Sequence, residues 1–394
     1  MRKKMASSKQ TQAVTELVAL VRASQSATSR FEDRFWDERI ESQVTSLLAA
    51  RQDDVIEAAL EGLAEHSLDE VQDLLECVHA ATQGLTLTVE DQQWQAVLLT
   101  CPFSVWTRYQ LPQAKLKPAD VEYFVQGLRD TVLAPGVKLH ALPKLLGLDE
   151  MPRSYSEIYH WLEPLAKLAL EQRATAPKTI TVEPNPALLV DTRHFIAAVV
   201  VPAGEPLFRW QADPQIDLSQ CQQAWAEHIT PRMAQLMPGC QFHALLPTTY
   251  HSGVDLSERH VRQVAIEGAS QWLTETLNLK PGELGASIAA VGEGETQEYR
   301  IGFYRRGRPE VIYGTIWPVF IDPVPEPNDG LIDSVDEIAA VLRANGVQHI
   351  TRIPGVLWPE SCEDCTAPFF PDTAGELVHV ELPEEAFDAP QHFH

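Results

Sequence analysis

The sequence predicts an α/β fold built from two similar halves, because one short stretch occurs in it twice. Residues 135–142 read PGVKLHAL and residues 238–245 read PGCQFHAL, so five of eight positions are identical at a constant offset of 103. The surroundings agree, since Arg108-Tyr109-Gln110 corresponds to Arg209-Trp210-Gln211 at an offset of 101. Strand and helix patterns alternate around both copies, as is typical of an internally duplicated α/β protein.

Length and charge limit the functions that the chain can have. Its 394 residues suffice for two or three packed units. A formal net charge of -24 argues against nucleic acid as a partner, because phosphate backbones are bound through surplus Lys and Arg. No apolar run is long enough for a membrane helix, and polar residues interrupt any signal peptide after the basic start. We therefore expect an acidic, soluble, cytoplasmic protein.

The N-terminal segment, residues 1–85, is expected to be helical. Its apolar residues recur at helical spacing, and Phe31, Phe35 and Ile40 belong to one stripe. The run Ser67-Leu68-Asp69-Glu70 matches a capping box, which opens a further helix. The pattern therefore predicts an antiparallel helical bundle ahead of the two halves.

Residues 86–180 and 181–321 are assigned to the two α/β halves, with a connector near residues 171–191. The first half should contain a strand at residues 96–99, a helix from Pro118, a strand at Val137–Leu142 and a helix capped by Ser154. The second should contain a strand at Phe195–Val201, a helix from Asp217 that Pro231 breaks or kinks, a strand at Cys240–Leu246 and a helix from Asp255 or Ser257.

Three strands follow the second copy, at residues 287–291, 299–304 and 311–318, with tight turns between them. We expect this antiparallel meander to extend the duplicated sheet. Residues 322–394 are assigned to an acidic linker, at 322–330, and a small C-terminal module. That module should contain a helix capped by Ser334, a strand at Val347–Ile353 and a Cys-x-x-Cys motif.

Three segments of the chain carry a family resemblance. They are residues 203–210 (AGEPLFRW), residues 298–307 (EYRIGFYRRG) and the Cys-x-x-Cys stretch together with residues 375–379 (GELVH). These segments resemble a family of uncharacterised bacterial proteins, and the resemblance covers nearly the whole chain. It implies a bacterial origin but no activity. In that family Gly follows the Cys-x-x-Cys, whereas this chain has Thr366 there.

Cys362 and Cys365 are the strongest candidates for metal ligands. Two thiolates three positions apart on a tight turn can reach one tetrahedral zinc ion. His379, fourteen residues after Cys365, supplies a third ligand, and His392 or His394 could complete the shell. Neighbouring acids argue against a redox pair and favour a bound cation, and the metal would be structural. The alternative is a pair of ordinary thiols on the tail, since one Cys-x-x-Cys alone is a weak zinc signal.

His140 and His243 occupy equivalent positions in the two copies. Each lies away from the more regularly apolar face of its strand. If a pseudo-two-fold axis relates the halves, the two rings could meet in a central cleft as ligands or as acid and base. The alternative is a repeated histidine that forms a hydrogen bond near the end of a strand.

The only local cluster of basic residues consists of Arg300, Arg305, Arg306 and Arg308, around a predicted hairpin turn. Such a turn could hold a phosphate or an acidic partner. Solvated arginines, or arginines paired with the chain's own acids, are the alternative.

Two classes of function remain open from the sequence, and it does not decide between them. The first is a non-catalytic binding or regulatory protein that holds a protein or a small molecule in the cleft between its halves. The second is a hydrolase or transferase with its active site in that cleft, using His140, His243 or the arginines. A match to a catalytic or cofactor motif in its required context is absent from the sequence.

Overall fold

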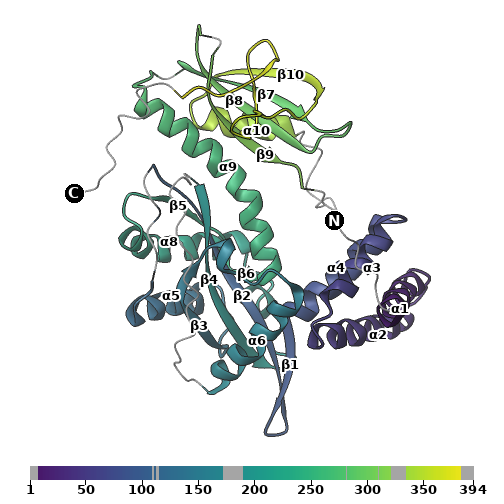
Figure 1. Cartoon of the computed structure of the whole chain (residues 1–394). Helices are drawn as coiled ribbons and strands as arrows, with labels where there is room; N and C mark the ends of the chain where they lie inside the picture. The colour runs from purple at the N-terminus through teal and green to yellow at the C-terminus, as the bar shows by residue number, and fades with distance from the viewer. Residues whose placement is uncertain are drawn as a thin grey trace.

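The computed structural model shows a mixed α/β protein with several sheets (Figure 1). It describes residues 8–108, 111, 115–171, 190–280, 282–308, 310–320 and 334–382. The expected linker at 322–330, and the connector before Val190 apart from its first residue, lie outside the described residues.

Four helices form the N-terminal bundle, as the apolar spacing predicts. They are α1 (Ser8–Ser24), α2 (Arg30–Ala49), α3 (Asp53–Ala64) and α4 (Leu68–Gln83). Their buried faces meet in a core that includes Leu17, Val44 and Leu48. Ser67 caps α4, because its Oγ accepts a hydrogen bond from the Glu70 amide at 3.4 Å. The sequence predicts Phe31 and Phe35 in the buried stripe of α2, but both side chains are exposed.

The central sheet joins the two halves of the chain. Its strands are β1 (Gly84–Val89), β2 (Gln92–Trp106), β3 (Lys138–Leu146), β4 (Val190–Pro202), β5 (Gln241–Ala244) and β6 (Thr248–Thr249). They run in the order β1-β2-β4-β3, and β5 and β6 also pair with β2. Strand β2 pairs with β4 from Trp94↔Pro202 to Trp106↔Val190. The expected cleft between two separate halves is therefore wrong for the described residues, because the halves share one continuous sheet.

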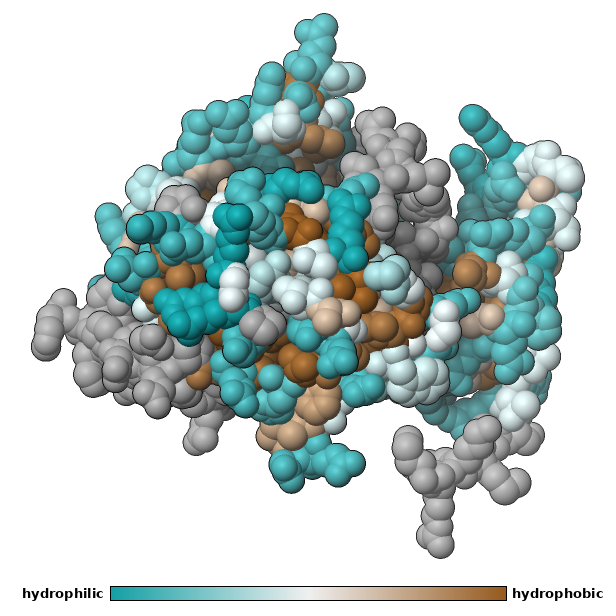
Figure 2. Space-filling model, turned by 90° about the horizontal axis from the view of Figure 1, so that it is seen from above, coloured by the Kyte–Doolittle hydropathy of each residue, from teal (hydrophilic) through white to brown (hydrophobic). Residues whose placement is uncertain are grey.

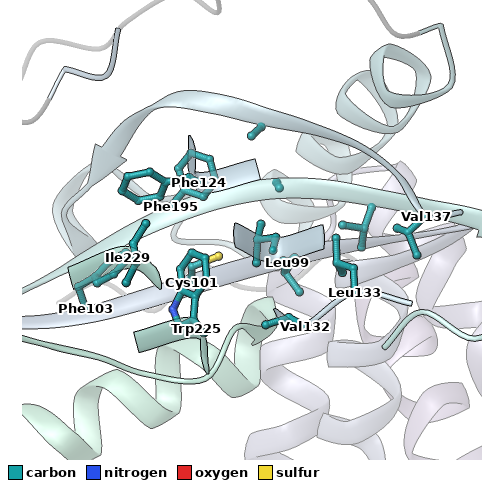
Figure 3. Packing of buried hydrophobic residues seen from close by; sticks show 14 of the residues in the cluster. Leu99, Cys101, Phe103, Phe124, Val132, Leu133, Val137, Phe195, Trp225 and Ile229 are labelled. Carbon is teal, nitrogen blue, oxygen red and sulfur yellow. The ribbon is translucent and has the colours of Figure 1, made fainter. Parts of the chain in front are cut away.

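One helix of each half covers the same face of this sheet. These helices are α5 (Pro118–Thr131) and α8 (Leu218–Leu236), and they pack on β2 and β4 in the largest core cluster. Figure 3 shows Phe103, Phe124, Phe195 and Trp225 meeting there. With the strand order β5-β2-β4-β3, this arrangement is a split β-α-β topology.

The opposite face is covered by α6 (Tyr155–Glu171) and by the first half of α9 (Tyr250–Thr276). Ser154 caps α6 as expected, since its Oγ accepts from the Glu157 amide at 3.2 Å. Helix α9 begins at Tyr250, earlier than the expected Asp255 or Ser257. Its 27 residues carry it beyond the central sheet to the C-terminal part of the molecule (Figure 1).

Helix α8 runs without interruption through Pro231, so of the two expected outcomes the break is wrong, and a kink stays a prediction. Proline inside a helix costs about 3 kcal/mol, because it removes one hydrogen bond and crowds the preceding turn. Trp225, Ile229 and Met233 are fully buried on either side of it. Each such side chain contributes about 1.5–3 kcal/mol by burial, which offsets the cost of the proline.

The meander forms a sheet of its own and does not extend the central sheet, contrary to the sequence expectation. Its strands are β7 (Leu284–Val291), β8 (Glu298–Arg305), β9 (Val311–Pro318) and β10 (His349–Leu357), in the order β10-β7-β8-β9. The second half of α9 and α10 (Ser334–Ala344) cover one face through Trp272, Leu273, Ile338 and Leu342. An apolar sheet face must be covered by another element, and the second half of α9, which extends beyond the central sheet, covers this one.

Hydrophilic residues cover most of the face seen from above, and hydrophobic residues gather in patches between them (Figure 2). This mixture is ordinary for a globular surface, where apolar atoms contribute more than half of the accessible area. Among the described helices, none is long and apolar enough to span a membrane.

Candidate metal centre

The expected helix and strand of the C-terminal module, α10 and β10, belong to the second sheet and its core, so the name module is kept here for residues 359–382. The two cysteines of the Cys-x-x-Cys motif lie on a tight turn in this module. The Cys362 amide donates to the Ala367 carbonyl at 2.8 Å, and the Thr366 amide donates to the Cys362 carbonyl at 2.9 Å. A small hairpin of β11 (Phe370–Pro371) and β12 (Leu377–Val378) follows. This hairpin returns the chain to the turn and places His379 beside Cys365.

Cys362, Cys365 and His379 converge on one point. One ligand atom from each lies within 4.8 Å of the others, and the Cys365 Sγ is 3.2 Å from the His379 Nε2. Ligands of a tetrahedral zinc ion are about 3.3–3.8 Å apart, given Zn–S and Zn–N bonds near 2.3 and 2.0 Å. Two thiolates and one imidazole are also donors that zinc prefers. The residues present therefore fit a zinc ion after a small adjustment of side chains.

The expected fourth ligands, His392 and His394, lie outside the described residues. Cys362 is half-buried, whereas Cys365 and His379 are exposed. The ligand cluster therefore faces solvent on one side, where a further ligand can reach it.

Thr366 adopts a backbone conformation that favours glycine. Its φ is 59°, in the left-handed region. Glycine reaches this region at little cost, while other residues are strained there by about 1–2 kcal/mol. The turn therefore keeps its tight shape here at the cost of local strain.

Arg300 holds the module and does not belong to the basic turn. It lies on β8 with only 4% of its surface exposed. Its Nη1 donates to the carbonyls of Glu360 at 2.6 Å and Phe369 at 2.8 Å, and its Nε pairs with Glu298 at 2.7 Å. The two carbonyls flank the cysteine turn, so one guanidinium ties both ends of that turn to the sheet.

Two glycines provide the surface on which the module lies. Gly302 on β8 and Gly314 on β9 are directly opposite each other. A Cβ at Gly302 would overlap the Pro371 carbonyl, and a Cβ at Gly314 would overlap the Phe370 ring. The bare backbone of β8 and β9 therefore allows β11 to lie flat against the sheet.

The other three arginines lie at the β8–β9 turn. Arg306 and Arg308 are exposed, and the Arg305 Nη2 donates to the Leu277 carbonyl at the end of α9, at 3.1 Å. The structure thus separates Arg300 from Arg306 and Arg308. Anion binding by the turn stays a prediction for the remaining residues.

His140 and His243 do not meet. They lie on β3 and β5, which flank β4 and β2, so three strand spacings of about 4.8 Å lie between them. They are also displaced along the strands, because the residues of β4 level with them, Ala198 and Thr192, are six positions apart. His140 lines a groove of about 1070 Å³ along β3, between α5 and α6. His243 lies beside α9 and belongs to a different environment.

His243 forms a polar cluster with α9. Its Nε2 is 2.8 Å from a carboxylate oxygen of Glu267, whose other oxygen accepts from the Trp106 indole at 3.3 Å. The hydrogen bond to Glu267 raises the pKa of His243, and the same bond lowers the pKa of Glu267. Burial lowers the pKa of the nearby His260 to about 4. The His243 ring is thus an ion-pair partner that fixes β5 to α9.

Sequence reasoning missed a second histidine cluster, where the N-terminal bundle meets α9. The rings of His79 and His251 stack at 3.8 Å with an angle of 6° between their planes, and the Thr82 hydroxyl is 2.7 Å from the His251 Nε2. Burial lowers their pKa values to about 4 and about 3. The two residues are 172 positions apart in the chain, so local spacing carries no signal for their contact.

Comparison with known proteins places the chain in a family. The sequence profile of the family described as "Protein of unknown function (DUF2863)" matches residues 1–393. The chain belongs to this family. Searches of curated proteins and of solved structures give no match. Membership confirms the resemblance to an uncharacterised family and brings no activity with it.

Proposed function

We propose that this member of the family binds one structural zinc ion through Cys362, Cys365 and His379. The observation that carries the proposal is the convergence of three zinc-type donors within 4.8 Å, from two segments of the C-terminal module. A short acidic module has little apolar core, and a metal bond supplies the free energy that a core would otherwise give. When bound, the metal would join the cysteine turn to the β11–β12 hairpin.

Metal analysis of protein purified without an affinity tag tests this proposal. We expect about one equivalent of zinc in the natural chain and a loss of most of it in Cys362→Ser, Cys365→Ser and His379→Ala variants. Cys240→Ser is the matched control, because Cys240 is half-buried and far from the cluster in the chain, and it should keep its zinc. Less than about one-half equivalent in the natural chain, or full retention in the three variants, would contradict the proposal.

We also propose that the protein is a non-catalytic binding protein, bacterial and cytoplasmic. The family resemblance supports the origin, and six free cysteines suit a reducing compartment. The net charge of -24 favours a protein or a small molecule over nucleic acid as its partner. Purification of the native protein and identification of what travels with it would test this. Recovery of bound nucleic acid would contradict it.

Catalysis at His243 is the second candidate, favoured by the 2.8 Å contact between His243 and Glu267. A carboxylate that orients an imidazole is the arrangement of a general base. Hydrolysis of 4-nitrophenyl acetate and 4-nitrophenyl phosphate by the natural chain and by His243→Ala tests it. Activity that disappears in the variant while melting is unchanged would favour the enzyme. Equal rates in both proteins would favour the binding protein.

We infer that the central sheet arose by duplication. His140 lies opposite Ala198 on β4, and His243 lies opposite Ser104 on β2, so β3 and β5 pair with exchanged partner strands. The register shift of β3 begins at Ala141, and β5 ends 103 positions later at Ala244. An experimental structure in which β2 with β3 fails to superpose on β4 with β5 would contradict the inference.

A further inference from the structure

A cavity of about 790 Å³ lies beside the bulge of β3, away from the metal centre. Its walls are the bulge itself, the short 3-10 helix Leu148–Glu150, the first turns of α6, and the turn between α2 and α3. The Ser156 amide donates to the Asp53 Oδ1 at 2.7 Å, which fixes the N-terminal bundle to α6 next to this cavity. Its volume falls in the range of pockets that hold small ligands, about 300–1,000 Å³.

The floor of the cavity is apolar. Leu142, Leu146 and Met151 line it and are 4%, 8% and 6% exposed. Trp161 adds an aromatic wall from α6. Such a surface binds a hydrocarbon or aromatic body, because contact with it removes apolar area from water.

The acids around the cavity are already engaged. Glu150 pairs with Lys144, and it accepts from the Gly147 amide at 3.2 Å. Asp149 pairs with Arg153 at 3.0 Å. Glu157 accepts from the Ser154 amide at 3.3 Å as part of the α6 cap. Two of the three carboxylates are thus paired with cations of the same cavity, and Glu157 is held by the backbone amides of Arg153 and Ser154.

Three nitrogen groups remain uncommitted there. The side chains of Arg51 and Lys115 are exposed, and neither forms a hydrogen bond or an ion pair with another residue in the described part of the chain. The His160 Nε2 is buried without a hydrogen-bond partner in that same part. Buried polar atoms are nearly always paired, so this ring in the cavity wall has a hydrogen-bonding group still to be satisfied.

We propose that this cavity binds an amphipathic organic anion. Its carboxylate or phosphate head pairs with Arg51 and Lys115 and accepts a hydrogen bond from His160, while its apolar body lies on Leu146 and Trp161. Four cations and three acids line this cavity on a chain with a net charge of -24, so the site suits a negative charge that most of the surface would repel. The proposal is independent of the zinc centre and of His243.

Isothermal titration with octanoate, octyl phosphate, 1-octanol and inorganic phosphate tests the site. We expect one equivalent of octanoate or octyl phosphate to bind at least about tenfold more tightly than 1-octanol, since the head groups of the two anions gain charge-assisted hydrogen bonds. Inorganic phosphate should bind weakly, because it has no apolar body. The anion that binds more tightly, octanoate or octyl phosphate, shows whether the site prefers a carboxylate or a phosphate head group. Equal affinity for octanoate and 1-octanol, or no binding of either anion, would overturn the proposal.

Variants assign the binding to these residues. The double variant Arg51→Ala/Lys115→Ala should bind octanoate about tenfold less tightly and 1-octanol as before. Both side chains are exposed, so melting followed by circular dichroism should not change. Lys167→Ala is the matched control, because Lys167 is an exposed cation on α6 that pairs with Glu163 and does not line the cavity. Unchanged octanoate affinity in the double variant, or an equal loss in the control, would overturn the assignment.

Discussion

The central sheet and the C-terminal module are held together by different forces. The central sheet is covered on both faces by helices, and Phe103, Phe124 and Trp225 are fully buried between the sheet and the helix pair α5 and α8. The module has two very short strands, a buried arginine under its turn and three metal-type ligands above it. The comparison teaches that burial of apolar surface suffices for the large unit, whereas polar contacts and a metal must order the small one.

The largest effect is expected from Phe124→Ala in the core of the central sheet. The ring contacts Phe195 at 4.7 Å between centroids and is fully buried. Its removal leaves a cavity and should lower the free energy of unfolding by about 3–5 kcal/mol, measured by urea titration. Leu218→Ala on α8, where the side chain is 47% exposed, is the control. A comparable loss in both variants would break the distinction between core and surface.

Arg300→Met should separate the module from the sheet while leaving the central sheet folded. The change leaves Glu298 unpaired and two carbonyls without a donor, at a cost of about 3 kcal/mol. Limited proteolysis should then cut residues 359–382 faster. Arg306→Met, at the exposed turn, is the control and should be cleaved at the same rate as the natural chain. Equal cleavage of all three proteins would show that Arg300 does not hold the module.

Thr366→Gly should strengthen the module. The left-handed φ of 59° strains threonine, and glycine removes that strain, with a gain of about 1 kcal/mol after its own entropy cost. We expect slower release of zinc to a chelator, by about fivefold. A matched change at an exposed residue with ordinary backbone, Thr373→Gly, should not slow release. Faster release from Thr366→Gly would mean that the turn does not need this conformation.

Acid should weaken the contact between the N-terminal bundle and α9. His79 and His251 have pKa values lowered from 6.5 to about 4 and about 3, because burial disfavours the charged ring. Their contribution to stability is present above pH 6.5. It is lost as the pH falls from 6.5 towards the folded-state pKa values of about 4 and about 3, since the unfolded chain takes up protons first. His243 has the opposite sign, because Glu267 raises its pKa, and its contribution is lost as the pH rises.

Urea midpoints between pH 7.5 and pH 4.5 measure this effect. His251→Phe should flatten the acid side of the profile, whereas His66→Ala, on an exposed residue at the end of α3, should leave it unchanged. An unchanged acid slope in His251→Phe would assign the pH dependence to other buried histidines, of which His194 and His260 also have pKa values lowered to about 4.

Local spacing predicted most of the secondary structure, and longer contacts explain what it missed. The caps at Ser67, Ser154 and Asp217, and the strands of the meander, could be predicted because their signals lie within a few residues. The separate second sheet could not be predicted from local spacing, since β10 pairs with β7 across more than 50 residues of the chain. The continuous α8 depends on buried residues flanking Pro231, and burial is decided by the whole fold.

The metal ligands could be proposed from the sequence because two of the three form a motif. The role of Arg300 in holding the cysteine turn could not be predicted, since its guanidinium donates to carbonyls 60 and 69 positions away in the chain. The same is true of His243, whose partner Glu267 lies on a helix 24 residues further along the chain. In both cases the residue type suggested chemistry, and only the fold shows that the arginine and the histidine hold elements together.

Hydrogen exchange with and without a chelator tests the central claim most directly. If zinc orders the module and apolar burial orders the rest, the chelator should speed amide exchange at Cys362 and Thr366, whose amides donate within the turn, by at least about tenfold. Exchange in β2 and β4 should not change. Equal protection of the turn before and after metal removal, or loss of protection in both regions together, would contradict the account.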